Sequence, residues 1–230
     1  MKRKFIVALI ILILLAVIFQ IVVPRLVSRE LKKGLEGELE AGEVVVRTSS
    51  FPVFKLLWGQ VDSLELKGED LVIDGLKVDR LGAEFKNLLL KQEDQYWLVS
   101  SGTNSYLYLK VDEESLNNYL ADLPELEVFE ELRVDLIPGR AMIVGQVNIV
   151  IKIPIQVEGD FRIDDSGDLI FFARQVAVGE MLISEDIISR LKDELEVRIN
   201  LTDFPLPLNV EEVKINDGKI EVFGESEKKE

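Results

Sequence analysis

The stretch AMIVGQVNIVIKIPIQVEGDFRI, residues Ala141–Ile163, decides the fold class because its apolar and polar residues alternate. Each odd-numbered position in it is apolar or glycine, and all of its charged side chains fall at even-numbered positions. A period of two places successive side chains on opposite faces of a β-strand. The stretch therefore predicts long antiparallel strands with one apolar face and one solvated face.

Turn-forming residues around this stretch predict where its strands end. Pro154 cannot donate a backbone hydrogen bond, so it marks either a sheet edge or the turn between two strands. DDSGD at Asp164–Asp168 predicts a turn, and LIFFARQVAV at residues 169–178 predicts the next strand. Near the C-terminus, VEEVKINDGKIEVFG predicts a hairpin that turns at residues 216–218.

The remaining segments predict further strands and three helices. VVVRTSS, VDSLELKG, LVIDGLKVDRL and AEFKNLLLK have the composition of strands. DEESLNNYLADL predicts a helix with an N-terminal cap at Asp112, and SEDIISRLKDELEVRI predicts another that begins at Ser184. PRLVSRELKKGLEGELEAG predicts a helix whose apolar stripe consists of Val27, Leu31, Leu35 and Leu39. These elements predict one α+β domain over residues 25–224.

The chain begins with a long apolar run. Phe5–Val23 contains nineteen residues, and Gln20 is its one polar side chain. A helix of this length spans about 28 Å, close to the thickness of the bilayer's hydrocarbon. No small-residue cleavage site follows the run, so we expect residues 1–24 to be a cytoplasmic tail and a transmembrane signal anchor; the alternative is a cleaved signal peptide.

The charges beside this run predict its orientation. Lys2, Arg3 and Lys4 form a short basic tail of the kind that is retained in the cytoplasm. We therefore expect a single-pass protein of the cytoplasmic membrane with the bulk of the chain extracytoplasmic. The alternative is a cytoplasmic domain on an inverted anchor, because basic residues also follow the run. Residues 225–230 predict a disordered, charged tail.

Composition excludes several classes of function. The chain has 42 acidic and 27 basic residues, a net charge of −15, and neither histidine nor cysteine. A Ser-His-Asp triad, a Cys-His pair, a Cys/His zinc site and a disulfide are therefore impossible. Binding of nucleic acid and electrostatic docking on anionic lipid both require a basic surface, and the acidic balance argues against them.

The motifs that resemble catalytic or metal-binding sites are incomplete. SRLK at residues 189–192 matches a Ser-Lys pair, but the companion segments of that chemistry are absent. DDSGD lacks the spacing and the distal glutamate of a calcium loop. Neighbouring acidic pairs such as Glu130–Glu131 point to opposite faces of a strand and form no carboxylate dyad. We therefore expect no enzyme, no cofactor and no metal.

Apolar side chains are the feature in excess. FPVFKLLW, residues Phe51–Trp58, is apolar except for Lys55. Such residues either form ordinary core or line a groove for acyl chains, which gain about 0.8 kcal/mol for each buried CH₂ group. Lys55 either contacts a lipid phosphate or extends its ammonium to solvent. The candidate groove residues are Leu31, Leu35, Leu39, Phe51, Phe54, Leu57, Trp58, Phe129, Phe171, Phe172 and Phe204.

The order of segments resembles a known family, the LmeA-like phospholipid-binding proteins of bacterial envelopes. The likeness covers residues 25–224. FPVFKLLWGQVDSLELKGEDLVIDGLKVDRLGAEFKNL has the family's aromatic-Pro run, glycine and following strands. VDEESLNNYLADL is similar to its acidic-capped helix. INLTDFPLPLNVEEVKINDGKIEVFGE is similar to its C-terminal signature, a Pro-punctuated connection and an Asp-Gly hairpin.

The resemblance implies a fold like that of the tubular lipid-binding proteins, in which a long curved antiparallel sheet wraps around amphipathic helices. It also implies phospholipid binding and a role in envelope lipid or glycolipid homeostasis. It brings no catalytic residue with it.

Three functions are therefore compared. The first is a membrane-anchored, extracytoplasmic protein that binds phospholipid or another acyl-chain lipid and contacts the membrane through residues 5–23. The second is a tethered scaffold with a filled core that stabilises an envelope protein partner. The third is an envelope hydrolase that uses only Asp, Glu, Ser or Lys.

Overall fold

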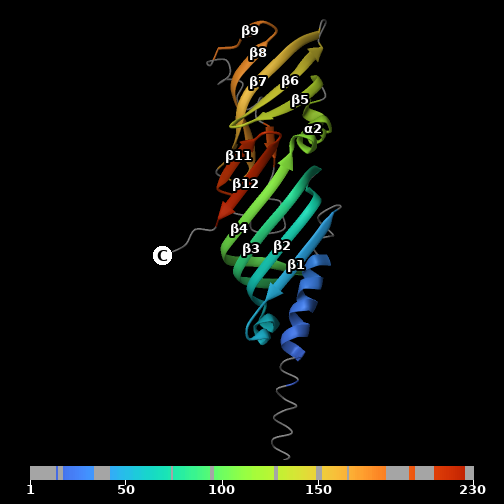
Figure 1. The fold of residues 1–230 in the computed structure, drawn as a ribbon, viewed down its shortest axis with the longest axis vertical. Helices are drawn as coiled ribbons and strands as arrows, with labels where there is room; N and C mark the ends of the chain where they lie inside the picture. Colours follow the sequence, from blue (N-terminus) through green and yellow to red (C-terminus); the bar gives the residue numbers. More distant parts are fainter. Residues whose placement is uncertain are drawn as a thin grey trace, which may run out of the picture.

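A computed structural model describes residues 14, 18–33, 42–73, 75–93, 96–126, 129–148, 152–164, 166–184, 197–199 and 210–225. The molecule is elongated, and its two β-sheets follow one another along the long axis (Figure 1). All of the strand pairs are antiparallel.

The first sheet combines the N-terminal strands with the C-terminal hairpin. Its strand order is β1 (Glu43–Ser49), β2 (Gln60–Ile73), β3 (Leu76–Glu93), β4 (Tyr96–Asp112), β12 (Lys219–Glu225) and β11 (Glu212–Asn216). The first four strands follow the order of the sequence, whereas β12 pairs with β4 from more than a hundred residues further along the chain.

The second sheet is built from the middle of the chain. Its strand order is β10 (Val197–Ile199), β8 (Leu169–Val178), β7 (Lys152–Ile163), β6 (Arg140–Asn148) and β5 (Phe129–Ile137), with β9 (Met181–Leu182) paired to β8. The helical elements are residues 18–33, η1 (Val53–Trp58), α2 (Glu113–Ala121) and η2 (Pro124–Leu126).

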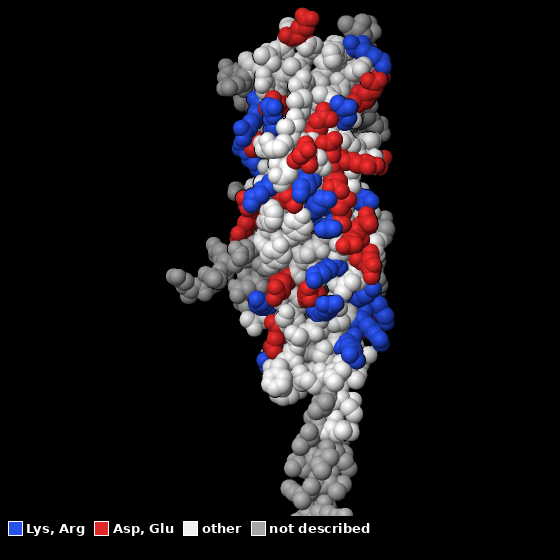
Figure 2. All heavy atoms as spheres, in the orientation of Figure 1, with Lys and Arg blue, Asp and Glu red and all other residues white. Residues whose placement is uncertain are grey.

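The outer face of the first sheet is solvated. Arg47, Glu65 and Glu84 are successive neighbours across β1, β2 and β3, and the Arg47 guanidinium lies 3.8 Å from the Glu65 carboxylate. Acidic and basic side chains are intermixed over the face drawn in Figure 2. This mixing explains how a strongly acidic chain pairs many of its charges locally.

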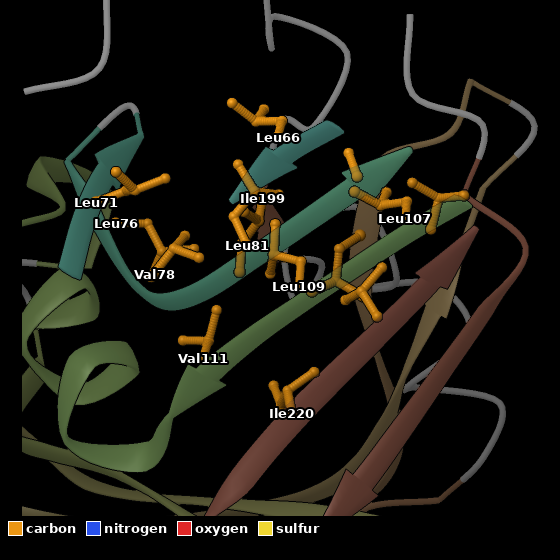
Figure 3. Close-up of a cluster of buried hydrophobic side chains, with 14 of the residues drawn as sticks. Leu66, Leu71, Leu76, Val78, Leu81, Leu107, Leu109, Val111, Ile199 and Ile220 are labelled. Carbon is orange, nitrogen blue, oxygen red and sulfur yellow. The ribbon is translucent and has the colours of Figure 1, made fainter. Parts of the chain in front are cut away.

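The inner face of the first sheet is apolar from one edge to the other. Val44, Gly68, Leu81, Leu109 and Val222 are successive neighbours across β1, β2, β3, β4 and β12. The four side chains in this row are buried. Figure 3 shows Leu81, Leu109 and neighbouring aliphatic residues in one cluster, which also includes Ile199 of β10. Alternation along each strand places these side chains on a single face.

Backbone hydrogen bonds join the two sheets. The Gly139 N–H, at the turn between β5 and β6, donates to the Ile215 carbonyl of β11 at 2.9 Å. The Gly218 N–H, at the turn between β11 and β12, donates to the Leu136 carbonyl of β5 at 3.1 Å. The Glu113 N–H at the start of α2 donates to the Gly218 carbonyl. Two hairpin turns and a helix start therefore form the joint.

The α+β class with long antiparallel strands is confirmed, as are the strand at 169–178 and the hairpin turn at 216–218. The prediction of one long sheet is wrong, because α2 follows β4 and strands β5 to β8 then pair among themselves in a second sheet. Among the described helices, residues 18–33 pack on the buried face of β1 through Ser28 and Thr48.

One predicted strand boundary is confirmed and another needs correction. Of the two alternatives for Pro154 the structure shows the edge position, because Pro154 lies within β7, opposite Gln146 of β6 and one residue beyond the last pair between β7 and β8. LVIDGLKVDRL is not one strand, because the hairpin between β2 and β3 turns within it, after Ile73.

Two helix predictions also need correction. Asp112 is the N-cap residue of α2, but its side chain makes no capping hydrogen bond and instead pairs with the Lys110 ammonium at 2.6 Å. The helix predicted from Ser184 does not reach Ile199, because residues 197–199 form β10 against β8. Residues 185–196 lie outside the described part of the chain.

Candidate functional site

The aromatic segment η1 lies at one end of the molecule, between β1 and β2 (Figure 1). Residues three apart are aligned in a 3₁₀-helix, so Val53 and Leu56 share a face, and both are buried. The aromatic side chains point outward: Phe51 is 76% exposed, Phe54 48% and Trp58 66%. The Phe54 and Trp58 rings pack edge to face, with centroids 5.6 Å apart.

Asp62 fixes the conformation of this segment. Its carboxylate accepts hydrogen bonds from the Phe51 N–H at 2.7 Å and from the Lys55 ammonium at 2.9 Å. The bond from Phe51, and then that from Lys55, lowers the pKa of Asp62 below its usual value. Lys55, the candidate for a lipid phosphate, is therefore paired with a carboxylate of β2.

The N-terminal helix, residues 18–33, is bonded to the same end. The Gln20 amide donates to the Ser50 carbonyl at 2.9 Å and accepts from the Val53 N–H at 3.1 Å. One turn further on, the Thr48 hydroxyl donates to the Pro24 carbonyl at 3.0 Å. The helix runs through Pro24 without a break and so crosses the predicted domain boundary after residue 24.

The predicted apolar stripe of this helix is partly described. Leu31 is buried, and Val23 and Val27 pack against the same core. Leu35 and Leu39 lie outside the described residues. The opposite side of the helix is also apolar but exposed, and it consists of Ile18, Phe19, Ile21, Val22 and Leu26.

These exposed helix residues, Phe51 and the η1 aromatics belong to two segments joined at the same end of the molecule, and we call them together the apolar end. It is defined by Ile18, Phe19, Ile21, Val22, Leu26, Phe51, Phe54 and Trp58. Figure 2 shows mostly uncharged atoms at this end of the described molecule on the face drawn. Exposed apolar side chains gathered at one end of a molecule in this way indicate a contact site.

The other candidate groove residues lie elsewhere. Phe171 is buried in the second sheet, where its ring contacts Phe161 at 5.5 Å. Phe172, its neighbour in β8, packs under the Arg162 guanidinium at 4.2 Å. Phe129 is half-buried at the start of β5. Phe204 and the side chain of Leu57 are not among the described parts. The described candidates are therefore divided between the apolar end, the core beside helix 18–33 and the second sheet.

Two apolar surfaces contain few of the candidate residues. The inner face of the first sheet is mainly aliphatic, with Phe85 among its buried side chains, and the alternation of Leu64, Leu66, Leu107 and Leu109 along β2 and β4 was the signal for it. The exposed side of helix 18–33 was assigned to a membrane span, in which every side chain is apolar and no face stands out.

The predicted anchor is only partly described. None of the described helices combines the length and hydropathy needed to cross a bilayer. Residues 5–13 and 15–17 of the predicted span lie outside the described parts. Among the residues that the structure describes, no group of three acidic side chains is arranged to hold a metal ion.

Comparison with known proteins agrees with this architecture. A family model described as LmeA-like phospholipid-binding matches residues 20–225. No curated protein and no solved structure matches the chain. The matched region begins at Gln20, the residue that joins the helix to η1, and ends with β12. The resemblance in the sequence is therefore confirmed, and the chain belongs to the LmeA-like phospholipid-binding family of lipid-binding proteins.

Proposed function

We propose that this protein holds phospholipid without chemically altering it, outside the cytoplasmic membrane, as part of envelope lipid or glycolipid homeostasis. The apolar run that precedes Ile18 anchors it beside that membrane. The observation that carries the proposal is the largely apolar inner face of the first sheet, in a chain whose family binds phospholipid.

The inner face suits an acyl chain in both extent and chemistry. Along β2 and β3 the buried side chains run from Leu71 and Val78 to Val61 and Leu88, next to η1. Strands advance about 3.3 Å per residue, so this face is as long as an extended acyl chain. Each methylene placed on it gains about 0.8 kcal/mol.

The candidate residues at the apolar end have a separate role in this proposal. Phe51, Phe54, Leu57 and Trp58 form the rim through which lipid approaches, and Leu31 lies in the core about three turns further along helix 18–33 from Gln20. Lys55 contacts the headgroup phosphate while sharing its charge with Asp62. Leu35, Leu39, Phe129, Phe171, Phe172 and Phe204 complete the proposed apolar lining.

Photocrosslinking of the full chain tests the proposal. The protein is reconstituted into phosphatidylcholine vesicles that contain a trace of phospholipid with a diazirine near the end of one acyl chain. After illumination, adducts are mapped by mass spectrometry. We expect adducts on inner-face residues such as Leu66, Leu81 and Leu109, and none on Glu65 and Lys67 of the outer face. Adducts confined to the apolar end and the residues before it would overturn the proposal.

A matched pair of variants sharpens this test. Ala83 lies between Leu66 and Leu107 in a row of the inner face. Ala83→Phe fills that row, and we expect inner-face adducts to fall about tenfold while a folded chain is retained. Gly82→Ala changes the neighbouring outer-face position, where an added methyl group meets nothing within 4 Å. This control should label like the original protein.

One observation favours the scaffold alternative. Leu66, Leu71 and Val222 are completely buried, as in a filled core. If the core is filled, the full chain gives no inner-face adduct, and a partner protein stabilises it or is stabilised by it. Unchanged thermal stability of both proteins on mixing would count against that role.

A further inference from the structure

We infer that the apolar end enters the headgroup region of a phospholipid bilayer, so that the molecule stands on this end. This assignment goes beyond the proposed function, because it concerns the outside of the protein and holds whatever the interior binds.

The concentration of exposed apolar side chains is the first argument. Within the described residues, fourteen large hydrophobic side chains are exposed, and nine of them belong to Leu14, helix 18–33, Phe51 and η1. They come from two segments that Gln20 joins through hydrogen bonds to Ser50 and Val53. The surface is therefore a built part of the fold rather than a scatter of single residues.

The distribution of charge identifies the occupant as a bilayer. Lys55, the one cation of FPVFKLLW, is paired with the Asp62 carboxylate at 2.9 Å. The helix carries no charge from Ile18 to Pro24 and then presents exposed Arg25 and Arg29. These lie about 9 and 15 Å from Phe19 along the helix axis, the depth that separates apolar insertion from headgroup phosphates.

Continuity of the chain supports the same occupant. Residues 5–17 contain no charged or polar side chain and precede the helix in the sequence. A bilayer that takes up this run would meet the apolar end, whereas a protein partner would have to share the surface with the run. Trp58 beside Phe54 has the composition of the aromatic belt found at membrane–water interfaces.

The architecture of η1 makes the surface testable. Val53 and Leu56 attach the segment to the core, whereas Phe51, Phe54 and Trp58 point away from it. Changes at the outward positions therefore leave the buried contacts intact. The chain has two tryptophans, so Trp97→Phe makes Trp58 the one fluorescent reporter.

The experiment measures quenching of Trp58 by lipid. The full chain with Trp97→Phe is reconstituted into phosphatidylcholine vesicles with or without bromine on the acyl chains close to the glycerol. Because Trp58 lies at interfacial depth, we expect brominated lipid to remove about half of its emission. Tyr106 is exposed on the outer face of β4. In the chain with Trp58→Phe, Trp97→Phe and Tyr106→Trp, the reporter should be unaffected.

Two other results would overturn the inference. Emission that bromine does not quench but aqueous iodide does would place Trp58 in water. Emission that neither reagent quenches would assign the apolar end to a protein contact such as a second copy of the chain. Neither result affects the inner-face adducts, so failure here and failure of the proposed function are distinguishable.

Discussion

Gly159 lies in β7 opposite Ala173 of β8, where the register of the two strands shifts. A methyl group added at this position would collide with the Phe172 carbonyl oxygen and lie 2.5 Å from the Phe171 ring. A backbone carbonyl within a sheet cannot move aside cheaply. We therefore expect Gly159→Ala to lower the free energy of unfolding by about 2–3 kcal/mol.

Thermal unfolding followed by circular dichroism measures this loss. Gly82→Ala is the matched control, because its methyl group would meet nothing within 4 Å on the outer face of β3. Its midpoint should stay within about 2 °C of that of the original protein. Equal midpoints for the two variants would mean that β7 and β8 are not packed as described.

Asp79 makes stability depend on pH. Its carboxylate accepts the Asp112 N–H at 2.6 Å, and burial, together with the nearby Asp112 side chain, raises the pKa of Asp79. A carboxyl group whose pKa is higher in the folded state destabilises that state when it is ionised. The folded state is therefore destabilised as pH rises through the folded pKa of Asp79 and the carboxyl group ionises. The lost stability returns as pH falls and Asp79 is protonated.

Asp79→Asn keeps an acceptor for the Asp112 N–H and removes the charge. At pH 7 we expect the midpoint of thermal unfolding to rise by about 1–2 °C. The gain should shrink as the pH approaches the usual range of carboxyl groups, because Asp79 is then protonated in the original protein too. A gain of the same size at every pH would contradict this explanation.

At the scale of elements, α2 protects the edge of the second sheet. The Asn117 amide accepts from the Val134 N–H at 2.7 Å and donates to the Val134 carbonyl at 2.9 Å. Glu113 accepts from the Leu136 N–H at 2.7 Å. The helix therefore supplies the hydrogen bonds that another strand would make to β5, and edges left open favour aggregation.

Asn117→Leu keeps the volume of the side chain and removes both bonds to Val134. Two backbone groups are then unpaired, and we expect a loss of about 2 kcal/mol, or about 4–8 °C in the midpoint. Asn118 is exposed on the same helix, and Asn118→Leu should change the midpoint by less than about 2 °C. A similar loss in both variants would assign the effect to helix propensity.

The elements were predicted where local pattern determines them. The alternation in β6 and β7 and the Asp-Gly turn at residues 216–218 depend on neighbours in sequence. β2 continues through Gly68, and the Leu71 side chain lies so close to that glycine that an added methyl group would be 2.5 Å from Leu71 Cδ1. That contact involves local geometry that no residue pattern records.

The sequence predicted which residues make up the candidate site but not which of their side chains point into the core and which into solvent. FPVFKLLW was recognised as an apolar segment with one cation, yet its inward residues, Val53 and Leu56, and its outward residue Trp58 have the same character. A segment without polar residues gives no period from which to separate its faces. Gln20 was the one polar residue of its run, and its role required knowing that β1 lies beside it.

At the scale of the whole molecule, the pairing of β12 with β4 was beyond prediction. Lys219 lies opposite Asp112, and Glu225 lies opposite Tyr106, so the chain's last strand completes the sheet that its first strands begin. Partners this far apart are chosen by the fit of complete faces. Local propensity therefore identifies the strands but not the sheet that each one joins.

Truncation tests this arrangement. A chain that ends at residue 209 lacks β11 and β12, leaves the edge of β4 open, and removes Ile220 and Val222 from the core. We expect it to be degraded rapidly by added protease and to aggregate. A chain that ends at Glu225 keeps both strands and should resist protease as the full chain does. Equal resistance of the two truncated chains would contradict the role of the hairpin.

The late position of this hairpin has a consequence for biogenesis. Synthesis proceeds from the N-terminus, so four strands of the first sheet and all of the second emerge before the segment that closes the former. Until then the backbone groups of β4 that pair with β12 have no partner strand in the nascent polypeptide. Chaperones and quality-control proteases recognise unpaired strands of this kind. A copy of the protein is therefore open to degradation until β11 and β12 have emerged and paired.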